Sequence, residues 1–304
     1  MRSFLEPSAQ AEANQGQDGD LYATARRVSG VSSAHFLKLL SCVAVAATLI
    51  YGREYAEQRD MMERGGELYT LTLGGDGKQS VFLREADYVS DLLQERFAAH
   101  GRITLVNHRD HLADRPLATS ASLGRSVQAL AERSGKEDLT FIYLTSHGSA
   151  QHELNLDQPR LQLDDLPASE LAALLEPLKD RHKVLVISAC YSGGFIPKLQ
   201  DDKTLIITAA RADRVSFGCS EENDFTYFGR ALFAEALQQT DDLQRAFKLA
   251  QASVAEREKA DGFEPSEPQI WPAKAVLAQW RALREQQAER ALNNALEAQS
   301  AVNR

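Results

Sequence analysis

The chain has 304 residues, of which 43% are hydrophobic and 25% are charged, an ordinary composition for a soluble globular protein. Its formal net charge is −9, and no basic stretch interleaved with aromatic residues occurs, which argues against nucleic-acid binding. The three cysteines, Cys42, Cys190 and Cys219, are too few and odd in number for a disulfide framework, so each is considered on its own.

The N-terminal part is polar at first and then apolar. Residues 1–30 are rich in Gln, Ala, Ser, Gly and Asp without apolar periodicity, so we expect a disordered tail. Segment 31–52 contains an uninterrupted apolar run from residue 39 to residue 51. Counted from Val31, it approaches the roughly 20 residues that span a bilayer, and the basic residues before the run favour a cytoplasmic N-terminus. We expect a membrane anchor at 31–51, with a cleaved signal peptide or a buried core helix as alternatives.

A folded domain follows a charged spacer. Residues 53–66 favour a helix that a glycine pair ends, and the domain is expected at 67–274. There, short apolar runs rich in β-branched residues alternate with amphipathic stretches. The runs are 68–73, 103–106, 139–145, 184–188 and 204–208. The amphipathic stretches are marked by Ala86, Val89, Leu93 and Phe97, by Leu123, Val127 and Leu130, and by Leu171, Leu174, Leu175 and Leu178.

Strands that alternate with helices imply right-handed crossovers and a parallel sheet with helices on both faces. The continuous apolar character of 141–144 and 184–187 suits central strands. After residue 208 the pattern becomes mainly helical. We therefore predict an α/β fold, a three-layer α/β/α sandwich with a mainly parallel central sheet, and a long C-terminal helix over 275–304.

Two strand ends carry reactive residues. Ligands of open parallel sheets bind beyond the carboxyl ends of the strands. The run 139–145 leads into His147, and the run 184–188 leads into Cys190. About 40 residues separate the two, enough for one crossover, and strands joined in this way are usually neighbours. We expect the two side chains to emerge side by side.

This pair suits nucleophilic catalysis. A neighbouring imidazole raises the thiolate fraction of a cysteine, and backbone N–H groups at Gly148 and Cys190 would stabilise the oxyanion that attack creates. Taken singly, a buried cysteine is usually a small hydrophobe and a histidine before glycine a turn residue. Their predicted juxtaposition makes a dyad of His147 and Cys190 the stronger interpretation.

Two strings, Leu-Thr-Ser-His-Gly-Ser at 144–149 and Ile-Ser-Ala-Cys-Tyr-Ser-Gly-Gly at 187–194, resemble the legumain, or asparaginyl endopeptidase, family of caspase-fold cysteine peptidases. The similarity runs from about Leu68 to Pro272, and further matches at 216–219 and 226–229 point to a bacterial legumain-like group. The resemblance implies a caspase-like fold and a peptide or protein substrate. It also implies His147 as proton donor to the leaving amine, Cys190 as nucleophile, an acyl-enzyme, and neither a metal nor an organic cofactor.

The resemblance further implies cleavage after Asn, and sometimes Asp. An asparagine amide needs a donor for its oxygen and an acceptor for its nitrogen. Arg84 occupies the place of the family's pocket arginine, and Ser188 is assigned to the same pocket. Glu221, Glu222 or Asp224 would supply the acceptor, with no choice made among them.

Four other interpretations remain: two stay open and two are set aside. Phe82 stands where family members place an auxiliary asparagine, so an inactive binding module remains an alternative, as does a transamidase that uses the same acyl-enzyme. No histidine follows Cys219, which we interpret as structural. His108 and His111 have the spacing of a metal-ligand pair but lack a cysteine or carboxylate cluster at matching spacing.

The apolar segment and the resemblance together predict a location. We expect a protein of the bacterial cell envelope, anchored in the inner membrane through residues 31–51 with the catalytic domain in the periplasm. A cytoplasmic protein is the alternative.

Overall fold

A computed structural model of the chain describes residues 66–302; the predicted tail, the predicted anchor and the spacer up to residue 65 lie outside the described residues. Within 66–302 the central sheet has six strands in the order β2-β1-β3-β6-β7-β8. They are β1 (Leu68–Gly74), β2 (Gly101–Val106), β3 (Leu139–Thr145), β6 (His182–Ser188), β7 (Thr204–Thr208) and β8 (Gln269–Trp271). All neighbours are parallel except β7 and β8. The α/β fold and the mainly parallel sheet are thus confirmed.

The helices vary in length and regularity. The longer ones are α3 (Ser80–Glu95), α4 (Ser120–Arg133), α9 (Leu243–Asp261) and α10 (Lys274–Val302). The shorter ones are α5 (Ala168–Leu174), α6 (Ile196–Leu199), α7 (Tyr227–Gly229) and α8 (Leu237–Gln239). Residues 66–302 also contain two short 3₁₀ turns, η1 (Glu176–Leu178) and η2 (Ser192–Phe195), and a π-helical segment, η3 (Arg230–Ala236). The short strands β4 (Glu153–Leu154) and β5 (Leu166–Pro167) form an antiparallel pair.

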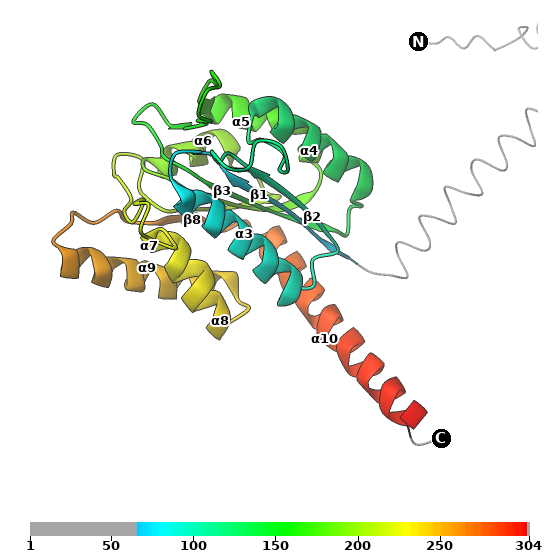
Figure 1. The fold of residues 1–304 in the computed structure, drawn as a ribbon. Coiled ribbons are helices and arrows are strands. Elements are labelled where there is room, and N and C mark those ends of the chain that lie inside the picture. The colour runs from blue at the N-terminus through cyan, green and yellow to red at the C-terminus, as the bar shows by residue number, and fades with distance from the viewer. Residues whose placement is uncertain (1–65, 303–304) are drawn as a thin grey trace, which may run out of the picture. The chain divides into compact units, whose positions relative to one another are not determined.

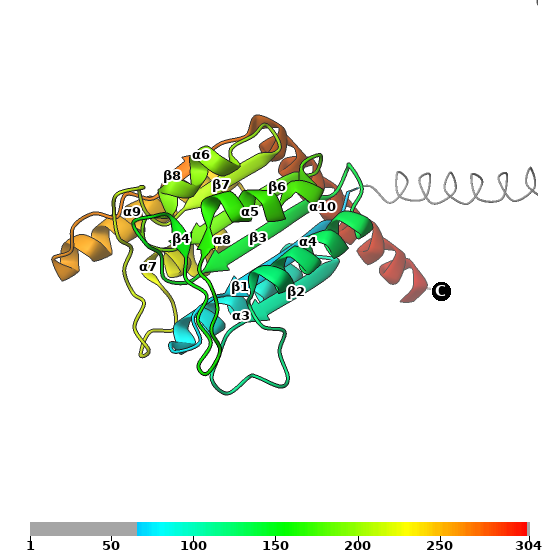
Figure 2. The ribbon, with the colours of Figure 1, turned by 90° about the horizontal axis from the view of Figure 1, so that it is seen from above.

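Helices cover both faces of the sheet (Figures 1 and 2). Successive side chains of a strand point to opposite faces. In β3, Phe141 and Tyr143 pack with α3, η3, α9 and α10, whereas Ile142 and Leu144 pack with α4 and α5. The central strands therefore have apolar side chains on both faces, which explains their unbroken hydrophobic runs and gives the three predicted layers.

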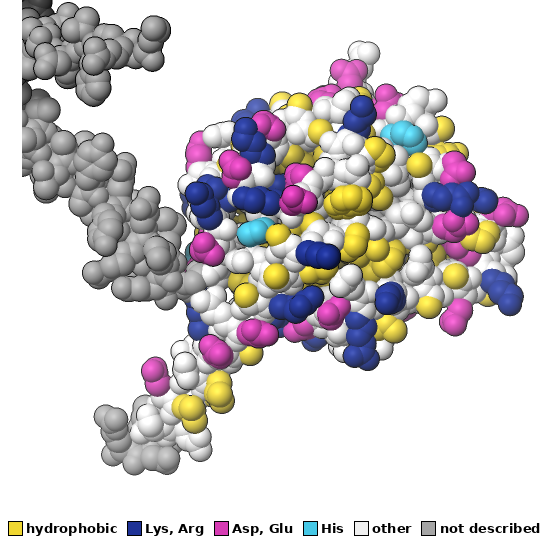
Figure 3. Space-filling model, turned by 180° about the vertical axis from the view of Figure 1, so that it is seen from behind, with side chains coloured by type: hydrophobic (Ala, Val, Ile, Leu, Met, Phe, Trp, Pro, Cys, Tyr) yellow, Lys and Arg dark blue, Asp and Glu magenta, His cyan; other side chains and the backbone are white. Residues whose placement is uncertain are grey.

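Helix α10 belongs to the core over its first turns only. Val276, Trp280 and Leu283 are buried, and the Trp280 ring lies 5.3 Å from that of Phe97 between centroids. Farther along, the helix projects away from the sheet (Figure 1) and Leu292 is 61% exposed. Figure 3 shows hydrophobic side chains on this projecting part, and charges of both signs over the rest of that face.

Residues 66–302 include no helix with the length and apolar character needed to cross a membrane. The predicted anchor at 31–51 is not among these residues, so it stays a prediction.

Candidate active site

The structure brings His147 and Cys190 to the same edge of the sheet. Strands β3 and β6 are parallel neighbours whose last residues, Thr145 and Ser188, are paired. Each candidate residue follows two positions later, and the Ser146 N–H donates to the Ser188 carbonyl at 3.2 Å. The juxtaposition therefore results from the strand register.

The two loops pack so closely that a glycine is required between them. A Cβ added at Gly148 would lie 2.2 Å from the Cys190 carbonyl oxygen and 3.1 Å from the Ala189 side chain. Real Cβ atoms do not approach a backbone oxygen so closely. Gly148 thus permits the contact that places the histidine loop against the cysteine loop.

The Cys190 thiol is half-buried and held by one neighbour. The Ser216 N–H donates to Cys190 Sγ at 3.3 Å, and Sγ lies 3.5 Å from the Ser216 carbonyl oxygen. The next residue, Tyr191, has a φ of 57°, a left-handed conformation that is costly for a side chain of this size. Its N–H donates to the Arg214 carbonyl at 2.7 Å, which holds the turn in place. Strained turns of this kind occur where a fixed side-chain direction matters.

A second histidine supports the same turn. A Cβ added at Gly194 would lie 2.1 Å from the ring of His152, so the imidazole packs directly on that backbone. His152 Nδ1 also lies 3.3 Å from the Tyr191 carbonyl oxygen. His152 therefore contacts the loop that carries Cys190 and not the sheet edge.

His147 faces an open cleft. Its Nε2 lies 2.8 Å from Gln79 Oε1, and its ring meets Phe82 edge to face, with centroids 5.0 Å apart and an interplanar angle of 78°. The cleft has a volume of about 360 Å³ and is lined by His147, Gly148, Asp76, Lys78, Ser149, Asn155, Asp157 and Asp165. Among the described residues the imidazole has no direct hydrogen bond to Cys190 Sγ. Such contacts often tighten only when substrate binds.

Two backbone donors at this edge are unused. Within residues 66–302 neither the Gly148 N–H nor the Cys190 N–H donates to another group, whereas the next N–H along each loop does: that of Ser149 donates to the Glu153 carbonyl and that of Tyr191 to the Arg214 carbonyl. Free N–H groups beside a nucleophile are what an oxyanion requires. The geometry at Gly148 and Cys190 is therefore compatible with the predicted oxyanion site.

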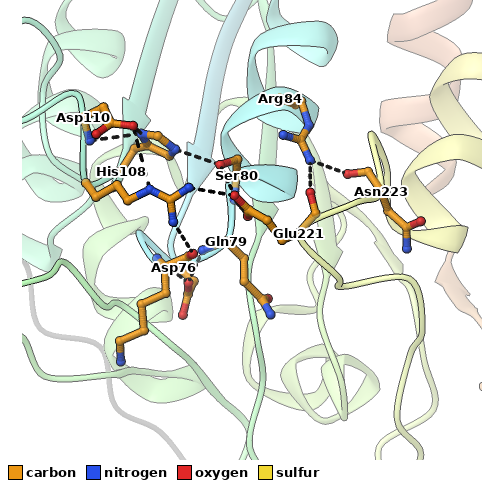
Figure 4. A network of polar contacts seen from close by, with 10 residues as sticks. Asp76, Gln79, Ser80, Arg84, His108, Asp110, Glu221 and Asn223 are labelled. Atoms are coloured by element: carbon orange, nitrogen blue, oxygen red, sulfur yellow. Dashed lines mark hydrogen bonds and ion pairs between the residues drawn. The ribbon is translucent and has the colours of Figure 1, made fainter.

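Arg84 lies against the loop that contains Glu221, Glu222 and Asp224 (Figure 4). Its Nη2 donates to the carbonyl oxygens of Glu221 at 2.7 Å and of Asn223 at 2.6 Å, and its Nε lies 3.6 Å from a carboxylate oxygen of Asp224. Glu222 is exposed in the same loop. The structure thus places Arg84 beside the loop that carries the three acidic candidates, with the arginine bound mainly to the loop backbone, and their role in a substrate pocket stays a prediction.

The Glu221 carboxylate has a different set of partners. It accepts from the Ser80 N–H at 2.6 Å, from the Ser80 hydroxyl at 2.9 Å and from Arg109 Nη2 at 2.8 Å. These bonds, the two from Ser80 first, lower the pKa of Glu221 to about 2. The Glu221 carboxylate is therefore ionised, and its oxygens already accept hydrogen bonds at the start of α3.

Ser188 lies beneath the sheet edge in a buried polar cluster. Its hydroxyl is 3.2 Å from the Thr226 hydroxyl, and the side chain is 2% exposed. The cluster is centred on Glu85, which accepts from the Tyr143 and Thr145 hydroxyls and from the Thr226 N–H. Complete burial raises the pKa of Glu85. A direct contact of Ser188 with substrate stays a prediction.

The possible metal ligand His108 and the second cysteine, Cys219, lie in other environments. His108 Nε2 lies 2.9 Å from the Ser80 hydroxyl, and burial lowers the pKa of His108. In the part of the chain that the structure describes, no three His, Cys, Asp or Glu side chains are grouped to hold a metal. Burial raises the pKa of Cys219 to about 12, so this thiol stays protonated at neutral pH.

Three residues that contact the site were not predicted from the sequence: Gln79, Glu85 and Ser216. Gln79 is the N-cap residue of α3, after the glycine-rich turn that ends β1, and Glu85 lies in the second turn of that helix. That turn was the one signal near Gln79. Nothing local marked Ser216 as a partner of the thiol.

Comparison with known proteins decides the family. The family model described as the Peptidase C13 family matches residues 120–279, which is more than half of the chain. The chain belongs to the peptidase C13 family. The match contains both His147 and Cys190, and membership in this family indicates a cysteine peptidase.

Other comparisons of this C13 family member are less informative. A comparison with curated proteins finds no match. Among solved structures, the chain is similar to caspase-1 from Spodoptera frugiperda, with 15% sequence identity and a TM-score of 0.48. That similarity covers 68% of this chain and 85% of the caspase chain.

Proposed function

We propose that this chain is a cysteine endopeptidase that cleaves peptide bonds after Asn, or after Asp, with His147 and Cys190 as its dyad. One observation carries the proposal. A half-buried thiol and an imidazole that faces a cleft follow paired strand ends, beside two backbone N–H groups that have no acceptor within residues 66–302. Family membership supports the same reaction class.

The reaction follows from these positions. Cys190 Sγ transfers its proton to His147 and attacks the peptide carbonyl carbon, and the carbonyl π electrons move to oxygen. The N–H groups of Gly148 and Cys190 donate to that oxyanion. The C–N bond breaks as His147 returns the proton to the leaving amine, which leaves a thioester on Cys190. Water, deprotonated by His147, then attacks the thioester and releases the acid and the free thiol.

The pocket assignment is part of the proposal. An asparagine side chain offers an oxygen that accepts and a nitrogen that donates. Arg84 would supply the donor. Because the Glu221 carboxylate already binds Ser80 and Arg109, Glu222 and Asp224 are the better candidates for the acceptor, and Asp224 is the nearer of these to the guanidinium. Asp224→Asn, compared with Glu222→Gln, should raise KM for an Asn peptide if Asp224 is the acceptor.

One experiment tests the chemistry. The full chain is incubated with a fluorogenic Asn peptide and, separately, with iodoacetamide, and the wild type is compared with Cys190→Ala and with Cys219→Ala as the matched control. We expect Cys190→Ala to abolish both cleavage and the dominant label, and Cys219→Ala to preserve both. Cleavage and labelling that persist in Cys190→Ala would show that the nucleophile is assigned wrongly.

The same assay separates the alternatives. Addition of an amine acceptor distinguishes hydrolysis from transamidation, because both reactions share the thioester and differ in the group that attacks it. A wild type that is labelled at Cys190 but cleaves no peptide would favour a binding module.

We further propose that the protein is anchored in the inner membrane of a bacterial envelope, with the peptidase domain in the periplasm. The apolar run between residues 31 and 51 supports this. Fractionation of cells tests it: recovery of the full chain in the soluble fraction, with that segment intact, would refute the anchor.

A further inference from the structure

We propose that Gln79 is a positioning residue for His147 in the reaction described above, a role that depends on the proposed function. Gln79 Oε1 lies 2.8 Å from His147 Nε2. An amide oxygen only accepts hydrogen bonds, so Nε2 carries the proton of the neutral ring and Nδ1 is left as the basic nitrogen. The contact therefore selects the tautomer of the imidazole as well as its orientation.

Gln79 is available for this contact because another residue caps its helix. It is the N-cap residue of α3, where a short polar side chain usually accepts from the first N–H groups, yet its side chain makes no capping hydrogen bond. Glu221 replaces that function by accepting from the Ser80 N–H and hydroxyl. Figure 4 shows the Gln79 side chain extending away from Glu221. The cap supplied by a distant segment thus leaves the longer Gln79 side chain free to reach the histidine.

The geometry around the contact is fixed on both sides. One carboxylate oxygen of Asp76 accepts from the N–H groups of Lys78 at 2.8 Å and Gln79 at 3.0 Å, which anchors the backbone below the side chain. Phe82, fully buried, lies three positions later on the same helix face and meets the imidazole edge to face. The hydrogen bond and the ring contact therefore restrain the imidazole in two directions.

Charged and titratable groups near His147 come from several segments. Cys190 follows the neighbouring strand, and Asp76, Lys78, Asp157 and Asp165 line the same cleft. Lys78 Nζ is paired with Asp157 at 2.8 Å. Substitutions at position 79 leave all of these groups in place. A change in the titration of His147 between such variants therefore reports the contact with Gln79.

The first test is kinetic. Gln79→Met removes the acceptor and keeps the side-chain length, Gln79→Glu keeps an acceptor, and Gln94→Met changes an exposed residue of the same helix as the matched control. We expect Gln79→Met to lower kcat for the Asn peptide about 10- to 100-fold, as loss of a partner that orients a functional histidine typically does, with KM changed by less than about twofold. Gln79→Glu should retain most of the wild-type kcat, and Gln94→Met should leave kcat unchanged.

The second test does not require cleavage. His147 is titrated by NMR in the full chain with labelled histidine, in the Cys190→Ala background, which removes coupling to the thiol. Gln79→Glu places a carboxylate beside Nε2 and should move the titration midpoint of His147 upward by about one pH unit or more, whereas Gln94→Glu should not.

An unchanged midpoint in Gln79→Glu, or a kcat in Gln79→Met equal to that of Gln94→Met, overturns the positioning role. If Gln79→Met fails to fold, the titration decides alone. If the wild type cleaves no peptide but the midpoint still moves in Gln79→Glu, the contact is upheld and the proposed peptidase function is refuted.

Discussion

The buried carboxyl of Glu85 should make the stability of this protein depend on pH in an unusual direction. Burial raises the pKa of Glu85 above its ordinary value of 4.5. The folded state therefore holds the proton more tightly than the unfolded state. The stability that the protonated carboxyl contributes is fully present below about pH 4.5 and is lost as the pH rises through the raised pKa of the folded state.

Two substitutions at Glu85 separate protonation from packing. Glu85→Gln keeps the size and an acceptor oxygen but removes the titration, so its free energy of unfolding should stay within about 1 kcal/mol of the wild type at low pH. As the pH rises, the wild type should lose up to about 1.4 kcal/mol per pH unit relative to this variant, until Glu85 is ionised. Glu85→Ala removes the acceptor of Tyr143, Thr145 and Thr226. It should cost about 3–5 kcal/mol, because buried donors without partners cost about 1–3 kcal/mol each and some hydroxyls can turn to other acceptors.

Urea unfolding, followed by the fluorescence of the buried Trp280, measures both effects between about pH 5 and about pH 8. Glu95→Gln, the same change at an exposed position of α3, is the control. The reasoning would be refuted if Glu85→Gln and Glu95→Gln showed the same dependence on pH, or if Glu85→Ala cost less than about 1 kcal/mol.

Three further outcomes are expected. Gly148→Ala should lower the melting temperature and abolish peptide cleavage, because its Cβ would lie 2.2 Å from the Cys190 carbonyl oxygen; thermal unfolding at an unchanged temperature would contradict this. Glu221→Gln should lower the urea midpoint at neutral pH. Because the pKa of Glu221 is lowered, its carboxylate stabilises the folded state fully above pH 4.5, and this stabilisation is lost as the pH falls through about 2. The difference in urea midpoint between Glu221→Gln and the wild type should therefore shrink under acid conditions. Iodoacetamide at neutral pH should label Cys190 and spare Cys219, whose pKa is raised to about 12; equal labelling, seen by peptide mass spectrometry, would show that the Cys219 thiol is accessible.

The strands were predictable where burial is two-sided. The five apolar runs correspond to β1, β2, β3, β6 and β7. Four of these strands, β1, β3, β6 and β7, are buried almost throughout, because a strand covered by helices on both faces needs apolar residues at consecutive positions. The edge strand β2 is only partly buried, and its run is correspondingly short. β8 was missed: it has three residues, lies at the edge of the sheet and is partly exposed, so it has no such run. The π-helical register of Arg230–Ala236 was also missed, since helical periodicity does not report which carbonyl each N–H contacts.

The site was predictable only as far as it depends on strand order. The positions of His147 and Cys190 follow from two neighbouring strands and their register. The role of Gln79 depends instead on Glu221, whose carboxylate binds Ser80 from 141 residues farther along the chain. The acceptor role of Glu85 likewise requires Tyr143, Thr145 and Thr226 to converge on one point. Contacts of this kind have no local signature in a sequence.

Helix α10 also has a consequence for synthesis of the chain. Trp280 packs against Phe141 of β3 and completes the face of the sheet opposite α4 and α5. While residues beyond Lys274 are still inside the ribosome, the strands that carry His147 and Cys190 have already emerged, with one apolar face partly uncovered. Nascent chains in that state expose surface on which chaperones act. A newly made chain therefore holds both reactive side chains before it has the complete scaffold that aligns them, and it gains that scaffold only when the helix docks.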